Sequence, residues 1–460
     1  MKDILLVLSD QHSYYYTSFV DHRIETPAIE RVAQDGLRCD RCYCNAPLCV
    51  PSRMSLLTGN LPSELNIFNN DTVLPADVPT IAHAFGIAGY HTVLVGRMHF
   101  KGDEQKHGFD ERLVGDITSQ YWGTGGKART DFGVYAGTTN RKNCLQVVGG
   151  GYSPVMAYDE AVFQGAMSYL QEKHDRPLFM VVGFYAPHFP FVTSEEKYEK
   201  YLPQFREDML SSCKADPVYR DYLQACSAER TAKCKAAYCG EVEILDSYVG
   251  QLYDRFRRQK EDYLFVYGSD HGEQLGKRGI FGKSTLYEEA IHVPLVMAGT
   301  GIQPGSQYQG CVSLLDLTKT LLSQAGIEAP WHHGNEINWE NDPKDLEPIK
   351  IEQVLEYGSD LIMAEAVLWD RYKAVRYAGK KICLYDMERD PDDEHEIENP
   401  EVLRKLSSFF LTEEKMHHCL DAECTHRKQQ MLLKQWGKAK RPNEWAGFTV
   451  PGCARNLPKE

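Results

Sequence analysis

The stretch CNAPLCVPSRMSLLTG, residues 44–59, holds a cysteine, a proline and an arginine at close and fixed spacing. Cys49 lies two residues before Pro51 and four residues before Arg53, and a helix-like run follows. A cysteine that only fills the core does not need an arginine at a set distance, whereas a reactive cysteine can use one. The spacing therefore makes Cys49 a candidate nucleophile, with Arg53 as its cationic neighbour.

Polar residues also stand directly after several of the apolar runs that we expect to be strands. Ligands of open α/β sheets bind beyond the carboxyl ends of the strands, so these residues are expected to converge. Taken singly, Asp10 could cap the next segment, His188 could be a satisfied buried histidine, and residues 270–272 could form a simple turn. Lys283 alone would be a solvated lysine. Their joint arrangement indicates a site, and its members are Asp10 and Gln11 after 4–8, Arg97 and His99 after 91–95, His188 after 178–185, and Asp270 and His271 after 263–268.

The chemistry that these side chains suit is hydrolysis of an anionic ester beside a hard cation. Carboxylate and amide oxygens, with one imidazole nitrogen, can hold Ca²⁺ or Mg²⁺. Arginine and lysine can hold the anion and offset developing charge, and histidine can move protons. The expected metal ligands are Asp10, Gln11, Asp270 and His271, the expected anion-binding residues are Arg53, Arg97 and Lys283, and the expected proton carriers are His99 and His188.

Sulfur does not fit this set of ligands. A hard cation prefers oxygen, whereas a thiolate selects softer metals. If Cys49 is the nucleophile beside such a cation, its soft sulfur atom is a poor match for that cation. The mismatch predicts that Cys49 does not remain a cysteine in the active protein.

Composition limits the partners and the compartment. The chain has 460 residues, 42% of them hydrophobic, and its formal net charge of −14 argues against nucleic acid or an anionic membrane as partner. The N-terminal apolar run is too short for a signal peptide, and no apolar stretch reaches the length of a membrane span. Cys39 and Cys42 lack the second cysteine pair of a zinc ribbon. We therefore expect a cytoplasmic protein with mostly free thiols.

Short apolar strands alternate with amphipathic helices up to about residue 350. This alternation predicts an α/β catalytic domain over residues 1–350, with a large, mostly parallel sheet between helices. Close-set strands over residues 351–420 predict a smaller antiparallel C-terminal subdomain. Residues 421–460 carry Trp436, Trp445 and Phe448 among broken turns, so we expect this tail to contact a neighbouring subunit of a homo-oligomer or to border its pocket. The expected strands are 4–9, 91–96, 177–185, 262–269 and 293–299, and the expected helices are 26–36, 79–90, 240–259 and 313–326.

The segment from Cys49 to Arg53, with Leu57-Thr58-Gly59 behind it, resembles the signature of type I sulfatases of the alkaline phosphatase superfamily. In that family Cys-x-Pro-Ser-Arg is the sequence by which the cysteine is oxidised to formylglycine. The resemblance covers most of the chain, and it is closest to choline-sulfatase-like and phosphonate monoester hydrolase-like members over residues 69–80 and 96–113. Further matching motifs are Gly96–His99, Ser269–Glu273, Lys283 with Tyr287–Glu289, and Val293–Leu295.

The resemblance implies an alkaline phosphatase-like fold and a small sulfate ester as substrate, with a sulfated sugar as one candidate. It implies one Ca²⁺, with Mg²⁺ or Mn²⁺ as substitutes, and a separate maturation enzyme that makes formylglycine at position 49. One oxygen of the hydrated formylglycine at Cys49 binds the metal and attacks sulfur to give a covalent sulfate ester. His99 then removes a proton so that the aldehyde reforms and sulfate leaves. His188 or Lys283 protonates the departing alcohol, and Asn70 falls near the ester.

Two positions depart from the family pattern. Arg97 stands where most members have lysine, which keeps the charge but makes proton transfer there doubtful. Gln11 replaces the commoner second aspartate, so its coordination of the metal is open. Lys101, two residues after His99, is expected to be solvated. The alternatives left open are a phosphonate monoester or phosphodiester hydrolase using the same site, and a degenerate binding protein that kept the fold.

Overall fold

The computed structural model describes residues 1–118, 131–132, 141–338 and 347–439. A nine-stranded sheet forms its centre. Across the sheet the strands follow the order β10 (Ser306–Tyr308), β2 (Leu37–Tyr43), β9 (His292–Gly299), β8 (Tyr263–Ser269), β1 (Asp3–Asp10), β6 (Leu178–Pro187), β3 (His91–Gly96) and β4 (Glu111–Leu113). The ninth strand, β11 (Val312–Ser313), pairs with β2. β1 pairs in parallel with β6 and β8, and β3 pairs in parallel with β6. The strand ends that carry the candidate residues are therefore immediate neighbours.

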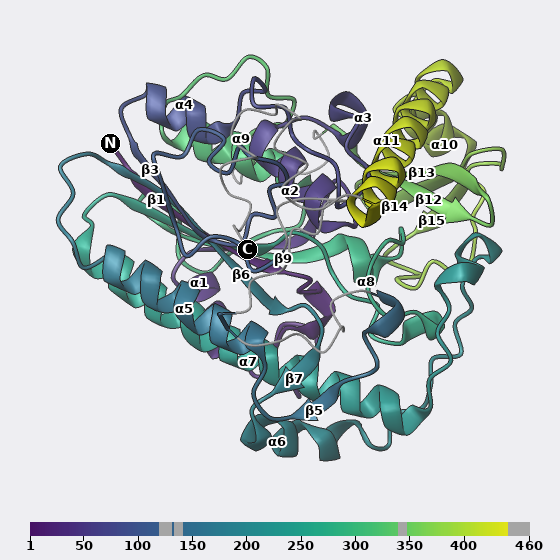
Figure 1. The fold of residues 1–460 in the computed structure, drawn as a ribbon, viewed down its shortest axis with the longest axis horizontal. Helices are drawn as coiled ribbons and strands as arrows, with labels where there is room; N and C mark the ends of the chain where they lie inside the picture. The colour runs from purple at the N-terminus through teal and green to yellow at the C-terminus, as the bar shows by residue number, and fades with distance from the viewer. Residues whose placement is uncertain (119–130, 133–140, 339–346, 440–460) are drawn as a thin grey trace.

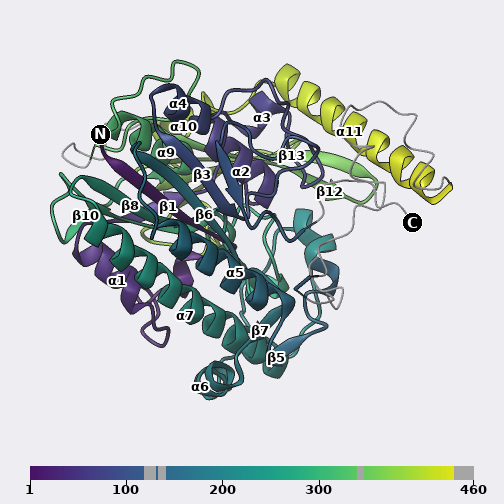
Figure 2. The same ribbon diagram turned by 60° about the vertical axis from the view of Figure 1, so that its left-hand side comes forward.

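Helices cover both faces of this sheet (Figures 1 and 2). The side chains of β1 alternate between two core clusters, because successive residues of a strand point to opposite faces. Leu5 and Val7 pack with Leu245 and other residues on one face, whereas Leu6 and Leu8 join the cluster on the other. The first face is covered by α1 (Pro27–Gln34), α5 (Pro154–Tyr169) and α7 (Ala228–Gln259), and the second by α2 (Cys49–Thr58), α4 (Ile81–Ile87) and α9 (Leu314–Gln324).

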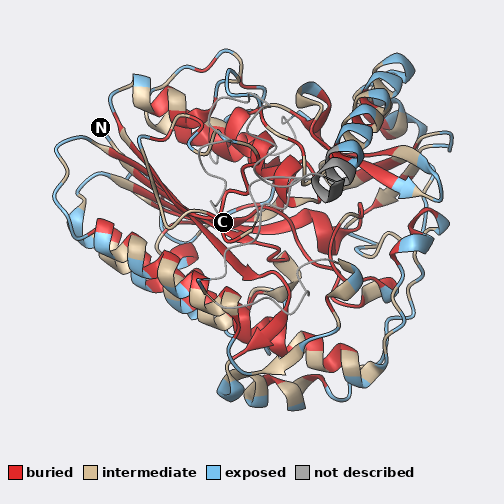
Figure 3. Cartoon of the chain, in the orientation of Figure 1, coloured by how far each residue is buried: buried red, intermediate tan, exposed pale blue. Residues whose placement is uncertain are grey.

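The central strands are buried along nearly their whole length (Figure 3). Every residue of β6 is buried, and so is every residue of β1 after Asp3. Strands that are covered on both faces need continuous apolar sequence rather than alternation, which explains runs such as LLVL and LFMVV. The sheet is therefore a rigid base for the residues that follow its strands.

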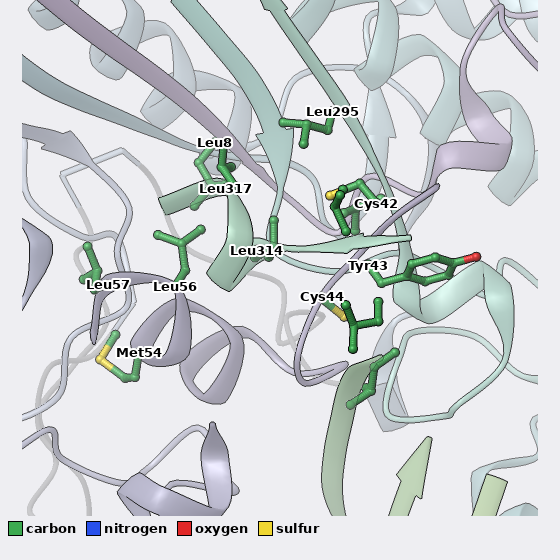
Figure 4. Packing of buried hydrophobic residues seen from close by; sticks show 14 of the residues in the cluster. Leu8, Cys42, Tyr43, Cys44, Met54, Leu56, Leu57, Leu295, Leu314 and Leu317 are labelled. Atoms are coloured by element: carbon green, nitrogen blue, oxygen red, sulfur yellow. The ribbon is translucent and has the colours of Figure 1, made fainter. Parts of the chain in front are cut away.

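Helix α2, which begins at Cys49, is buried at every position. Gly59 ends the helix in the left-handed region, with φ of 70°, where a residue without a side chain is favoured. The helix packs against α9 in the large core cluster (Figure 4). This packing fixes the position of Cys49 relative to the sheet. The two helices contribute Met54, Leu56, Leu57, Leu314 and Leu317 to the cluster.

A second sheet forms the C-terminal part and consists of β12 (Ile349–Tyr357), β13 (Asp360–Trp369), β14 (Tyr372–Tyr377) and β15 (Cys383–Asp386). All of its neighbouring strands are antiparallel. Ile351, Leu355 and Leu368 belong to the same core cluster as Leu6 and Leu8 of β1, so this sheet packs directly on the main body. Two helices follow, α10 (Pro400–Ser407) and α11 (Glu413–Ala439).

The predicted fold class is confirmed: a large, mostly parallel sheet lies between helices, and an antiparallel sheet follows it. Two features differ from the expectation. β9 runs antiparallel to both β8 and β2, and β2 itself was not predicted, because its sequence LRCDRCY mixes polar and apolar residues. The remaining α-helices and strands are α3 (Pro62–Leu65), α6 (Glu195–Phe205), α8 (Glu288–Ile291), β5 (Val148–Gly150) and β7 (Phe191–Thr193).

The expected C-terminal tail starts inside α11, which runs from Glu413 to Ala439. Residues 440–460 lie outside the described residues, so the contact of this tail with a neighbouring subunit stays a prediction. Among the helices of the described residues, none is both long enough and apolar enough to span a bilayer.

Candidate active site

Four side chains from three segments meet at the carboxyl ends of β1 and β8. Asp10, Cys49, Asp270 and His271 are buried, and each offers a ligand atom within 4.8 Å of the others. The backbone N–H of Gln11 donates to Asp270 Oδ1 at 3.0 Å, which ties the two strand ends together. The sequence prediction that these strand ends converge is confirmed by this geometry.

Cys49 lies at the N-terminus of α2 and touches two of these groups. Its Sγ is 3.7 Å from Asp10 Oδ1 and 3.2 Å from His271 Nε2. Burial and Asp10 raise the pKa of the thiol, but Lys283 and His271 outweigh them and lower it. The backbone N–H of Val50 donates to Asn70 Oδ1 at 2.9 Å, so Asn70 caps the start of the helix beside Cys49.

Arg53 and Arg97 donate hydrogen bonds to the carboxylates of Asp10 and Asp270. Arg53 donates through Nε to Asp270 Oδ2 at 2.8 Å and through Nη2 to Asp10 Oδ2 at 3.3 Å. Arg97 donates through Nε to the same oxygen of Asp10, and its guanidinium lies 4.4 Å from the centre of the Tyr185 ring. Burial raises the pKa of Asp10, but Arg97 and Arg53 together hold it well below its usual range. Asp10 is therefore charged, and both carboxylates are held in fixed orientations, as metal ligands must be.

His271 points Nε2 into this cluster, and burial lowers the pKa of the ring, but Asp270 and Cys49 outweigh burial and raise it. Its Nδ1 lies 3.1 Å from the carbonyl oxygen of Gly272, so Nδ1 carries the proton and donates it. Nε2 then faces Asp10 Oδ1 at 3.7 Å and Asp270 Oδ1 at 3.6 Å. Ligand atoms on opposite sides of a Ca²⁺ ion are about 5 Å apart at most, given bonds of roughly 2.3–2.6 Å. The two carboxylates and this imidazole thus fit a divalent cation in both spacing and donor chemistry.

Gln11, also expected to bind metal, is engaged by other side chains. Its amide oxygen accepts a hydrogen bond from Lys283 Nζ, and its Nε2 donates to Glu273 Oε2. Glu273 Oε1 also accepts from the backbone N–H of Leu275 at 2.8 Å and of Gly282. Glu273 thereby joins the Gln11 amide to the loop that carries Lys283.

Lys283 and His188 line a cavity of about 300 Å³ that reaches Asn70 and Pro51 of the Cys49 segment. His188 Nδ1 donates to the carbonyl oxygen of Phe189 at 2.7 Å, which leaves Nε2 as the lone-pair nitrogen. Burial lowers the pKa of His188, and Lys283 lowers it further, so the ring is neutral. The cavity therefore has a neutral imidazole and the amino group of a lysine on its wall.

His99 lies beside Arg97, away from that cavity wall. Arg97 Nη2 donates to His99 Nδ1 at 3.1 Å, and the backbone N–H of His99 donates to Asp116 Oδ2 at 2.6 Å. Burial lowers the pKa of His99, and Arg97 and Lys101 lower it further. Its backbone adopts φ of 64°, so the carboxylate of Asp116 holds an uncommon conformation in place.

Lys101 corrects an expectation, because its side chain is buried rather than solvated. The residue is 6% exposed, and burial lowers the pKa of its ammonium. Asp116 and Glu273 were both missed by the sequence interpretation. Asp116 follows β4 in the stretch ERLVGD, where an acidic residue after a strand could have signalled it. Glu273 lies in the Ser269–Glu273 motif, but the family resemblance assigned it no role.

Replacing Asp116 by alanine is expected to lower kcat by about 100-fold, since small displacements of positioned groups cost that much. The change removes the acceptor of the His99 N–H and one partner of Arg97, whose Nη1 lies 3.3 Å from Asp116 Oδ1. Asp110→Ala serves as control, because that half-exposed carboxylate pairs with Arg176 at the surface. A parent-like kcat for Asp116→Ala on an aryl sulfate would contradict the positioning role.

Comparison with known proteins places this site in a family. Residues 2–327 match the family model described as sulfatase, and residues 276–418 match N-sulphoglucosamine sulphohydrolase, C-terminal. A choline-sulfatase of Rhizobium meliloti (strain 1021) is 30% identical over 429 residues, which cover 85% of this chain and 81% of that protein.

Solved structures share the fold at lower identity. A phosphonate monoester hydrolase of Agrobacterium radiobacter superposes with a TM-score of 0.68 at 19% identity, covering 95% of this chain and 96% of its own. A putative sulfatase from Bacteroides thetaiotaomicron VPI-5482 gives a TM-score of 0.67 at 20% identity, covering 93% of each chain. With the family match over most of its length, the chain belongs to the sulfatase family and is a sulfuric ester hydrolase.

Proposed function

We propose that this sulfatase hydrolyses a small sulfate ester through a formylglycine made from Cys49, beside one bound Ca²⁺. The observation that carries the proposal is the meeting of Asp10, Cys49, Asp270 and His271 at the strand ends, next to a cavity of about 300 Å³. A pocket of this volume lies at the small end of ligand sites, which supports a small alcohol or a single sugar as leaving group.

Asp10, Asp270 and His271 would hold the cation, with an oxygen of the modified residue 49 as a further ligand. Oxygen donors dominate this set, which supports Ca²⁺ over zinc, with Mg²⁺ or Mn²⁺ as substitutes. A bound cation would offset the negative charge of the sulfate group and draw it toward position 49. Gln11 is left out of the proposed ligands, because Lys283 engages its amide oxygen.

The chain's own residues orient the reactants. Arg53 and Arg97 fix the carboxylates of Asp10 and Asp270, and the N-terminus of α2 favours negative charge at position 49. A formylglycine hydrate there supplies an oxygen nucleophile, which suits the hard-ligand site better than a thiol. Lys283 and His188 line the cavity, so we assign them to protonation of the leaving alcohol. His99 does not line the cavity, and we assign it to removal of the proton that lets sulfate leave.

Maturation and location complete the proposal. Cys49 is completely buried within a helix, so the maturation enzyme must reach it before the chain has folded. The cysteines of the described residues are free. Free thiols suit a reducing compartment, so the proposed location is the cytoplasm.

Turnover of three ester classes tests the proposed reaction. We expect kcat/KM for an aryl sulfate to exceed that for an aryl phosphonate monoester and for a phosphodiester by about tenfold or more, roughly 1.4 kcal/mol of transition-state discrimination. The second candidate is a phosphonate monoester or phosphodiester hydrolase, favoured by the likeness to the Agrobacterium enzyme over 95% of this chain. A higher kcat/KM for either phosphorus ester would select that candidate instead.

A further inference from the structure

The cavity beside position 49 extends beyond the residues assigned to catalysis. From His188 and Lys283 it continues to Arg141, Tyr222 and Glu356, which have no role in the reaction described above. Because His188 and Lys283 face the leaving alcohol, this outer part of the cavity is where the remainder of that alcohol would lie. Its chemistry therefore bears on which esters the enzyme accepts.

Arg141 is held rigidly in this outer part. Its guanidinium carbon lies 3.7 Å from the centre of the Tyr222 ring, a stacking arrangement that fixes the plane of the guanidinium. Its aliphatic carbons pack beside Gly282, since a Cβ built on that glycine would lie 3.7 Å from Arg141 Cγ. Gly282 directly precedes Lys283, so Arg141 stands next to the lysine that faces the ester.

One nitrogen of the Arg141 guanidinium lacks a hydrogen-bond partner among the residues that the structure describes. This atom, Nη1, is buried. A buried charged donor without a partner costs free energy, and such groups in native proteins usually await a ligand, an ion or water. The atom borders the substrate cavity, so a ligand in that cavity is its natural partner.

The carboxylates of the same cavity already have partners. Glu352 accepts hydrogen bonds from the backbone N–H and the hydroxyl of Ser63, at 2.8 and 3.0 Å. Glu356 Oε1 accepts from Arg427 Nη1. Glu356 acts electrostatically on Arg141, and so does Asp221, which lies outside the cavity and 3.4 Å from Arg220. The cavity group that still lacks a partner is therefore the cationic donor Arg141 Nη1, which suits an anionic ligand and not a cationic one.

We propose that Arg141 is a specificity-determining residue that binds a second anionic group on the leaving alcohol, a carboxylate or a sulfonate-type oxygen group. The inference rests on the proposed sulfatase reaction and deepens it by naming the substrate class: sulfate esters of alcohols that themselves carry negative charge. A planar guanidinium binds either oxyanion through a pair of N–H donors. A leaving group with a cationic end would meet Arg141 with the wrong sign of charge.

Four aryl sulfates that differ only in one substituent test this inference: 3-carboxyphenyl, 3-sulfophenyl, 3-carbamoylphenyl and 3-trimethylammoniophenyl sulfate. The parent enzyme is expected to turn over a carboxylate or sulfonate ester with a kcat/KM about tenfold or more above that of the carboxamide, because a site with an unpaired donor rejects a ligand that cannot pair it. The cationic ester is expected to be the poorest. The carboxylate and sulfonate arms distinguish the two possible anions.

Variants locate the effect at Arg141. Arg141→Gln is expected to lower kcat/KM for the preferred anionic ester about tenfold more than for the carboxamide ester. Arg220→Gln is the matched control, since that arginine stacks on Tyr357 with its carbon 4.4 Å from the ring centre and does not line the cavity. Its ratio of anionic to neutral turnover is expected to equal that of the parent.

Equal kcat/KM for the anionic esters and the carboxamide in the parent enzyme would overturn the inference, whether or not Arg141→Gln folds. So would a preference that survives Arg141→Gln unchanged. In both cases the sulfatase reaction itself would stand, because the carboxamide ester is still hydrolysed. Absence of turnover for every aryl sulfate by formylglycine-bearing enzyme would instead contradict the proposed function.

Discussion

Replacing Cys49 by alanine is expected to lower kcat by about 1,000-fold or more while leaving the fold intact, because the side chain forms bonds in the reaction. The thiol lies at the start of α2 and contacts Asp10 and His271 rather than the apolar core of the helix. Truncation there removes the nucleophile and little packing. Turnover of an aryl sulfate, with thermal unfolding measured on the same sample, checks both parts.

Cys44→Ala is the matched control for this variant. Cys44 is also buried, five residues earlier, but its Sγ faces the carbonyl oxygen of Ala290 at 3.9 Å, outside the cluster of candidate ligands. We expect this variant to lose some stability and to keep its kcat. Comparable activity losses in the two variants would mean that Cys49 acts through structure and not through chemistry.

Asp270→Ala is expected to abolish both metal binding and turnover, with a fall in kcat of about 1,000-fold or more, as for residues that act as a unit. The carboxylate is one of the oxygen donors, accepts from Arg53 Nε at 2.8 Å, and accepts the backbone N–H of Gln11 at 3.0 Å. Its loss leaves the buried guanidinium of Arg53 with fewer partners, so the free energy of unfolding should also fall, by about 3–5 kcal/mol.

Metal analysis of the purified protein separates these effects. The parent is expected to hold one Ca²⁺ per chain and to lose activity on thorough chelation, whereas Asp270→Ala is expected to hold none. Asp159→Asn is a suitable control, because that buried carboxylate accepts the backbone N–H groups of Tyr185 and Ala186 and lies outside the ligand cluster. It should retain the ion. Near-normal turnover by Asp270→Ala, or by the chelated parent, would refute the metal site.

The sequence was sufficient to predict the convergence of strand ends, and the reason is physical. Buried strands such as LLVL and LFMVV are continuous apolar runs, so the polar residue that ends each run is conspicuous. Parallel pairing then brings Asp10, His188 and Asp270 to one edge, as the neighbouring positions of β6, β1 and β8 confirm. The spacing of Cys49 and Arg53 could also be interpreted from local sequence, because residues four apart lie about one helical turn from each other.

Contacts between distant segments could not be predicted in this way. Asp116 reaches the backbone N–H of His99 only because β4 pairs with β3. The engagement of Gln11 by Lys283 joins residues that are 272 positions apart. The burial of Lys101 and the antiparallel direction of β9 likewise depend on which elements pack together, and local sequence carries no information on that choice.

Peptide mass spectrometry over residues 44–53 tests the central claim most directly, since every proposed role in this site depends on the chemical state of position 49. Protein produced together with a sulfatase-maturating enzyme is expected to carry formylglycine at position 49 and to be active. Protein produced without that enzyme is expected to be folded, unmodified and nearly inactive. Fully active protein that shows only an unmodified cysteine at position 49 would contradict the account.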